Sequence, residues 1–131
     1  MKITADTNVL VRVLVEDDLR QSKAAQTALQ KAEVVAISTS ALCEVAWVLS
    51  QGYEIHPADT AESIRRLLRG AVVTNRPAAE AGLAMLDAGG DFADGVIAYE
   101  GSWLGAETFV SFDRRAVKLL QAQGKSAQLL S

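Results

Sequence analysis

Four acidic residues stand where the sequence pattern would bring carboxylates to one end of a parallel sheet: Asp6, Glu44, Asp94 and Asp113. Asp6 ends the first strand-like run, and Asp113 follows the run at 109–112. Ligand sites of open parallel sheets lie beyond the carboxyl ends of the strands. Two carboxylates about 4 Å apart repel each other by about 4 kcal/mol at an effective dielectric constant near 20, so converging acids without lysine partners favour a divalent cation. Ligation by oxygen alone is typical of Mg²⁺ or Mn²⁺.

The other two acids, Glu44 and Asp94, come from predicted helices rather than from strand ends. Glu44 lies in SALCEVAWVL and Asp94 in DFADGVIA, and both segments are rich in apolar residues. Removing an unpaired charge from water is costly. Since each acid is embedded among apolar residues, we expect something positive to balance its charge.

Helix capping is the alternative explanation for these acids. Aspartate after a strand is a common N-cap, so Asp6 before Thr7 and Asn8 would simply begin the first helix, and Asp113 before Arg114 would begin the last. Glu44 would then be a charge at the rim of a partly exposed helix. Spacing alone leaves both interpretations open.

The elements that would position these acids alternate between strand and helix. Strands are predicted at Lys2–Ala5, Val34–Ile37, Val72–Thr74, Thr108–Ser111 and Ala127–Leu130. Helices are predicted at Asn8–Val15, Arg20–Ala32, Ser40–Gln51, Pro57–Gly70, Ala78–Ala88, Phe92–Leu104 and Arg114–Ala122. This alternation predicts an α/β fold with a parallel sheet.

Composition narrows the class of protein. The 131 residues are 50% hydrophobic and carry a net charge of −3, which predicts one globular domain over residues 1–131 and argues against nucleic-acid binding through a generally basic surface. The single cysteine, Cys43, fits a reducing compartment, so the predicted location is cytoplasmic. No apolar run reaches the length of a membrane span, and Asp6 interrupts the N-terminus too early for a signal peptide.

The segments DTNVL, STSALCEVAWVL, DFADGVIA and TFVSFDRRAV, in this order, resemble the PIN-domain family over nearly the whole chain. Within that family the chain looks like the VapC-type toxin ribonucleases of type II toxin–antitoxin systems. The resemblance implies a PIN-like three-layer α/β/α sandwich with a central, mainly parallel sheet, and a metal-dependent endoribonuclease. It also implies one or two Mg²⁺ or Mn²⁺ ions, a cognate antitoxin protein as partner, and a homodimer.

The same resemblance assigns roles to individual residues. The matching acids, taken as catalytic and as metal ligands directly or through water, are Asp6, Glu44, Asp94 and Asp113. Asp91 remains either a helix cap or a further ligand, because it lies three residues before Asp94 and near the same helix face. Thr7 and Asn8 match small polar positions that would hold Asp6 in its liganding rotamer, with helix capping as the alternative.

Substrate binding needs a local source of positive charge. Arg114 and Arg115, with Lys118, lie beside Asp113 and are the candidates for contacting RNA phosphates, although a solvated helix face would have the same pattern. Trp47 and Trp103 lie within apolar helical patterns, which favours a place in the core or an interface over base stacking.

Two other classes of protein compete with the nuclease. A phosphatase of the haloacid-dehalogenase kind also begins with an aspartate after the first strand, but its chemistry needs a second aspartate where this chain has Asn8. A non-catalytic PIN-like module would bind a partner and lose the acids, whereas all four are present.

Overall fold

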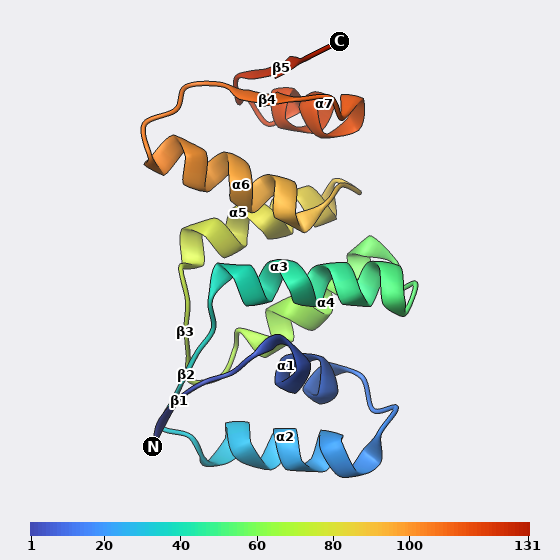
Figure 1. Ribbon diagram of the computed structural model, residues 1–131, viewed down its shortest axis with the longest axis vertical. Coiled ribbons are helices and arrows are strands. Elements are labelled where there is room, and N and C mark those ends of the chain that lie inside the picture. The colour runs from blue at the N-terminus through green and yellow to red at the C-terminus, as the bar shows by residue number, and fades with distance from the viewer. The chain divides into compact units, whose positions relative to one another are not determined.

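The computed structural model describes all 131 residues and divides the chain into two compact units, residues 1–76 and 77–131. Figure 1 traces the order of the elements along the chain, and each unit combines parallel strands with helices.

The first unit is built around a three-stranded parallel sheet in the order β1-β2-β3, with Ile3 opposite Val35 and Val35 opposite Val72. Two helices lie between β1 and β2 along the chain, and two more between β2 and β3. The elements are β1 (Lys2–Thr4), α1 (Thr7–Leu14), α2 (Leu19–Lys31), β2 (Val34–Ala36), α3 (Thr39–Trp47), α4 (Pro57–Leu67) and β3 (Val72–Val73).

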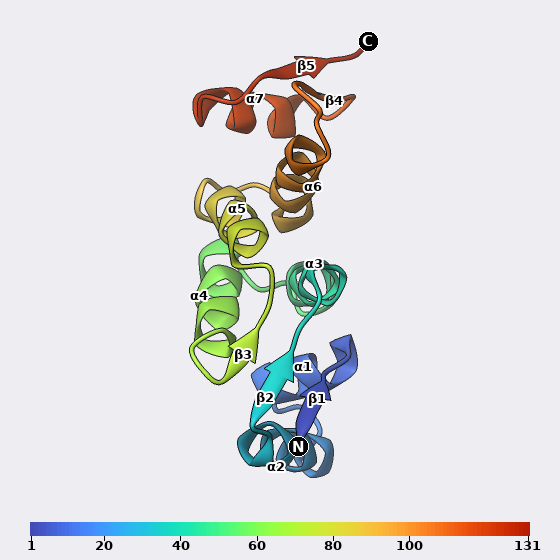
Figure 2. The ribbon, with the colours of Figure 1, turned by 90° about the vertical axis from the view of Figure 1, so that its left-hand side faces the viewer.

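The second unit pairs β4 with β5 in parallel, with Val110 opposite Gln128. Helix α7 connects these two strands and packs against them (Figure 2). The elements are α5 (Arg76–Asp87), α6 (Phe92–Trp103), β4 (Phe109–Ser111), α7 (Arg114–Ala122) and β5 (Ala127–Leu129).

Short polar side chains begin most of the helices. An N-cap oxygen satisfies a backbone N–H group that has no partner within the helix, and its loss typically costs about 1 kcal/mol. Ser38 accepts from the N–H of Ala41 at the start of α3, and Asp18 accepts from that of Gln21 at the start of α2. The helix boundaries are therefore fixed by local sequence, which is why the predicted elements match the observed ones within a few residues.

Helices α5 and α6 of the second unit approach each other closely because each carries a glycine at their contact. A Cβ atom on Gly82 would lie 2.6 Å from Cδ2 of Phe92, whose ring is fully buried. A Cβ atom on Gly95 would overlap the carbonyl oxygen of Ala81. The helix pair that carries Asp94 therefore depends on these two glycines.

The structure confirms the predicted α/β class with parallel strands. Helix α3 continues as a π-helical turn, Val48–Gly52, which ends one residue beyond the predicted helix Ser40–Gln51. Of the two places predicted for the tryptophans, the core is excluded, because Trp47 is 62% exposed and Trp103 is 71% exposed, and the prediction of an interface stays open. No helix of the structure has the length and apolar character needed to cross a membrane.

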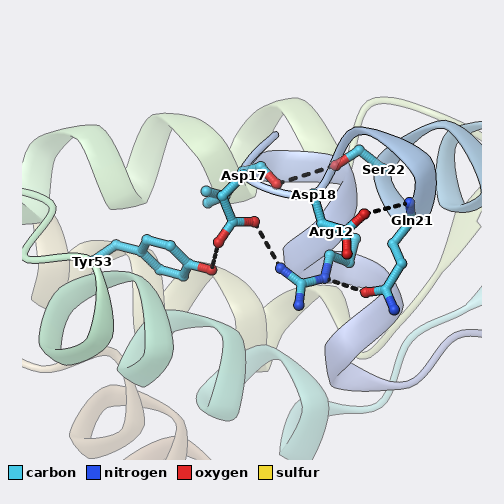
Figure 3. A network of polar contacts seen from close by, with 7 residues as sticks. Arg12, Asp17, Asp18, Gln21, Ser22 and Tyr53 are labelled. Atoms are coloured by element: carbon cyan, nitrogen blue, oxygen red, sulfur yellow. Dashed lines mark hydrogen bonds and ion pairs between the residues drawn. The ribbon is translucent and has the colours of Figure 1, made fainter.

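A polar network ties the C-terminal end of α1 to the segment that follows α3 (Figure 3). The Tyr53 hydroxyl donates to one carboxylate oxygen of Asp17, and Arg12 donates to the other, both at 2.7 Å. Arg12 also donates through Nε to Gln21 at 2.7 Å, which joins α1 to α2. These bonds fasten together the helices that carry Asp6 and Glu44.

The network predicts a pH-dependent effect of Tyr53→Phe. The hydrogen bond from Tyr53, with the Arg12 charge, lowers the pKa of Asp17 below its ordinary value of 3.8, and the same bond raises the pKa of Tyr53 above 10.0. The stabilisation is therefore lost as pH falls through the lowered pKa of Asp17 and as pH rises through the raised pKa of Tyr53. We expect Tyr53→Phe to lower the Tm at neutral pH and to raise the pKa of Asp17 in a carboxyl NMR titration. A Tm difference that is constant between pH 2 and pH 7 would contradict this role.

Candidate acidic site

Two helix N-termini of the second unit bring three carboxylates to one place. Asp91 is the N-cap of α6 and accepts from the N–H of Ala93 at 3.1 Å. Asp113 is the N-cap of α7 and accepts from the N–H of Ala116 at 3.1 Å. Asp94 lies in the first turn of α6. The three acids line one pocket of about 200 Å³, together with Gly89, Gly90 and Arg115.

Asp94 has a perturbed pKa. Its pKa is raised above the ordinary 3.8, first by burial and then by the negative charges of Asp91 and Asp113. No basic side chain or hydrogen bond acts in the opposite direction. The pocket therefore carries more negative charge than the protein itself balances.

The predicted acids of the first unit, Asp6 and Glu44, lie on separate helices. Asp6 is the N-cap of α1, where it accepts from the N–H of Val9 at 3.2 Å, and it borders a shallow groove along α1 and α2. Glu44 is on the exposed side of α3. This exposure agrees with the alternative of a charge at the rim of a partly exposed helix, because the apolar side of α3 is formed by the neighbours of Glu44 in the helix.

The structure thus brings together two of the four predicted acids, Asp94 and Asp113, and adds Asp91 to them. Helix capping and a place at the pocket are not exclusive alternatives, since Asp91 and Asp113 each use one oxygen as a cap. Asp6 likewise uses its Oδ1 atom as a cap. Thr7 and Asn8 follow Asp6 in the first turn of α1, as expected.

Sequence reasoning missed the turn that places Asp91. Helix α5 ends with Gly89 at a φ of +84°, and the N–H groups of Gly89 and Gly90 donate to the carbonyls of Leu86 and Met85. This is the Schellman arrangement, in which a left-handed glycine closes a helix. The Gly89-Gly90 pair ends α5 and leads directly into the Asp91 cap of α6.

The donor set of the pocket fits a hard divalent cation in its chemistry. All three acids supply carboxylate oxygens, which Mg²⁺ and Mn²⁺ prefer, and the one basic residue of the pocket, Arg115, offsets only part of their charge. No three acidic, histidine or cysteine side chains of the structure are arranged closely enough to hold an ion by themselves. The Asp6 and Glu44 carboxylates have the same oxygen chemistry.

The raised pKa of Asp94 predicts a stability effect in the metal-free protein. A carboxyl group with a raised folded-state pKa contributes stability that is complete below its unfolded-state pKa and is lost as pH rises through the folded-state value. Asparagine at position 94 does not ionise, so the Asp94→Asn variant does not lose this stability as pH rises. We therefore expect its Tm at pH 7 in chelator to exceed that of the native chain by roughly 1–4 °C, a small difference because solvent screens the charges of this partly exposed site. The difference should shrink toward pH 3. Scanning calorimetry from pH 3 to pH 7 measures it, with Glu80→Gln, an exposed acid on α5, as the control; a lower Tm for Asp94→Asn would contradict the interpretation.

A known protein family matches most of this chain. The PIN domain model matches residues 3–120, which include all of the candidate acids. No curated protein matches the chain significantly. Because the family model covers nearly the whole chain, the protein belongs to the PIN domain family, whose members are generally metal-dependent nucleases that bind RNA.

Proposed function

We propose that this protein is a Mg²⁺- or Mn²⁺-dependent endoribonuclease. The observation that carries the proposal is the environment of Asp94, a half-buried carboxylate that shares a pocket with two others and with a single basic residue, Arg115, in a chain of the PIN domain family. Perturbed titratable groups in a pocket are typical of functional sites. The proposed metal ligands are Asp6, Glu44, Asp94 and Asp113.

The proposed chemistry is hydrolysis of an RNA phosphodiester. A bound divalent ion would supply Lewis-acid stabilisation of the phosphate charge and a lowered pKa of an attacking water. The role of the carboxylates is to hold that ion, and Asp91 and Asp113 also keep their oxygens oriented through the backbone N–H groups that they accept from. The lone histidine, His56, caps α4 by accepting from Ala58 through Nδ1, so we assign it no part in proton transfer.

The biological role that we propose is that of the toxin in a toxin–antitoxin pair, acting in the cytoplasm and paired with a small antitoxin protein. The support is the order of the four acidic motifs along the chain, which resembles the VapC-type ribonucleases. The proposal also includes a homodimer. Arg114 is proposed as an RNA phosphate contact, because it is exposed at the start of α7, next to Asp113.

The test is cleavage of a labelled pool of structured RNA by the purified chain in Mg²⁺, in Mn²⁺ and in chelator. We expect cleavage that requires metal, together with Mn²⁺ binding that calorimetry detects without RNA. A chain that neither binds Mn²⁺ nor cleaves RNA would contradict the proposal and favour a partner-binding module.

Induced expression in a bacterial host tests the toxin role, since growth should stop for the native chain and continue for Asp94→Asn.

A further inference from the structure

Arg115 occupies a position that helix stability does not explain. It is the second residue of α7, immediately after Arg114, in the first turn of the helix. The N-terminal end of a helix carries partial positive charge, so a cation there is unfavourable. Something other than the helix must account for the placement of this guanidinium group.

Its one hydrogen bond is made to the turn between α5 and α6. Nη2 of Arg115 donates to the carbonyl oxygen of Gly89 at 2.7 Å and so joins residues that are 26 positions apart. The turn lies directly on α7: a Cβ atom on Gly89 would be 2.8 Å from Nη2 of Arg115, and one on Gly90 would be 2.6 Å from Cδ1 of Leu119. The positive φ of Gly89 is a conformation that glycine adopts readily, and the absence of a side chain leaves room for the Arg115 guanidinium group.

This turn determines where the acids of α6 begin. Asp91 follows Gly90 directly and caps α6, and Asp94 lies one turn further along the helix. Asp113 caps the helix that carries Arg115. The bond from Arg115 to Gly89 therefore links the two helix N-termini from which all three carboxylates of the pocket project.

We propose that Arg115 is a positioning residue, which fastens the turn at 88–91 to α7 and thereby holds Asp91 and Asp94 beside Asp113. This inference rests on the proposed function, because cation binding is the property that the positioning serves. It also changes the sequence-based interpretation of Arg115 from an RNA contact to a residue that acts through the acids.

The direction in which the cation affinity changes when Arg115 is removed distinguishes this role from simple electrostatics. Removing a positive charge near three carboxylates strengthens cation binding if the charge is all that matters. Removing a residue that orients the metal ligands weakens cation binding, typically by 10- to 100-fold. Arg114, which is adjacent, exposed and equally charged, provides the matched comparison.

The experiment compares Arg115→Ala, Arg115→Lys and Arg114→Ala. Manganese binding is measured by electron paramagnetic resonance without RNA, and amide hydrogen exchange of residues 88–94 is measured without metal. For Arg115→Ala we expect about tenfold weaker Mn²⁺ binding and faster exchange. Arg115→Lys should recover part of both, because one N–H donor is enough for the Gly89 carbonyl. Arg114→Ala should neither weaken Mn²⁺ binding nor speed up the exchange of residues 88–94.

Kinetics provide a third measurement. A positioning role predicts that Arg115→Ala lowers kcat with the KM for RNA little changed, whereas a phosphate contact raises KM and reduces the salt dependence. Unchanged or tighter Mn²⁺ binding by Arg115→Ala overturns the inference. If the native chain itself binds no Mn²⁺, the proposed function fails instead, and exchange at 88–94 alone then decides whether Arg115 fastens the turn.

Discussion

Asp94→Asn is expected to lower kcat/KM for RNA cleavage by about 10³-fold, which corresponds to about 4 kcal/mol of transition-state stabilisation. Groups that merely orient metal ligands contribute 10- to 100-fold, so loss of a proposed ligand should exceed that range. The substitution keeps the size of the side chain and removes its charge. Since the same change relieves the repulsion from Asp91 and Asp113, the inactive variant should be at least as stable as the native chain.

Lost activity together with retained stability would distinguish loss of a metal ligand from loss of the fold. Cleavage rates are measured at several Mn²⁺ concentrations for the native chain, Asp94→Asn and Glu80→Gln, an exposed acid of the same unit. Mn²⁺ should raise the Tm of the native chain and of Glu80→Gln, because a ligand that binds only the folded state stabilises it, and should leave Asp94→Asn nearly unchanged. Full activity in Asp94→Asn would remove this carboxylate from the site.

The elements of the fold were predictable because their boundaries are decided locally. An aspartate, serine or histidine before each of six helices accepts a backbone N–H within two or three residues, and Pro57 begins α4 at the position where its missing N–H costs nothing. The five strands are short, β1 to β3 are rich in β-branched residues, and each one pairs in parallel as expected.

The side of a helix that faces solvent was harder to predict. Helices α3 and α6 are apolar around most of their circumference, so periodicity does not mark a single buried face. This is why the apolar patterns around Trp47 and Trp103 left the core open as a place for them although both are exposed, and why the pattern around Glu44 did not show that it faces solvent.

The candidate site was predictable in its chemistry and not in its contacts. The acids themselves were identified from their places after strands and within apolar helices, and Asp94 is indeed half-buried. The bond between Arg115 and Gly89 joins positions 26 residues apart, and it depends on the left-handed backbone of one glycine. No local pattern in the sequence specifies such a contact.

Gly95→Ala is expected to destabilise the protein by about 3 kcal/mol, at the upper end of what overpacking costs in a rigid core. A Cβ atom at this position would overlap the backbone carbonyl of Ala81 and would lie 2.8 Å from Cγ of Met85. Main-chain atoms in the middle of α5 cannot move aside as a flexible side chain can, so α6 must shift. Because Asp94 precedes Gly95, that shift also displaces the carboxylate on which the proposed activity depends.

A second glycine of the same helix provides the control. Gly101 has open space where its Cβ would be, so Gly101→Ala should stabilise the protein by about 0.4–1 kcal/mol through the lower conformational entropy of the unfolded chain. Thermal unfolding should therefore move in opposite directions, down by roughly 10 °C for Gly95→Ala and up by a few degrees for Gly101→Ala. Equal effects of the two substitutions would show that helix propensity, rather than the close approach of α5 and α6, governs the response. A lower Tm for Gly95→Ala and a higher Tm for Gly101→Ala would establish that the close contact between α5 and α6 at Gly95 fixes α6 and with it the position of Asp94. The place of the two glycines in the sequence does not reveal this difference.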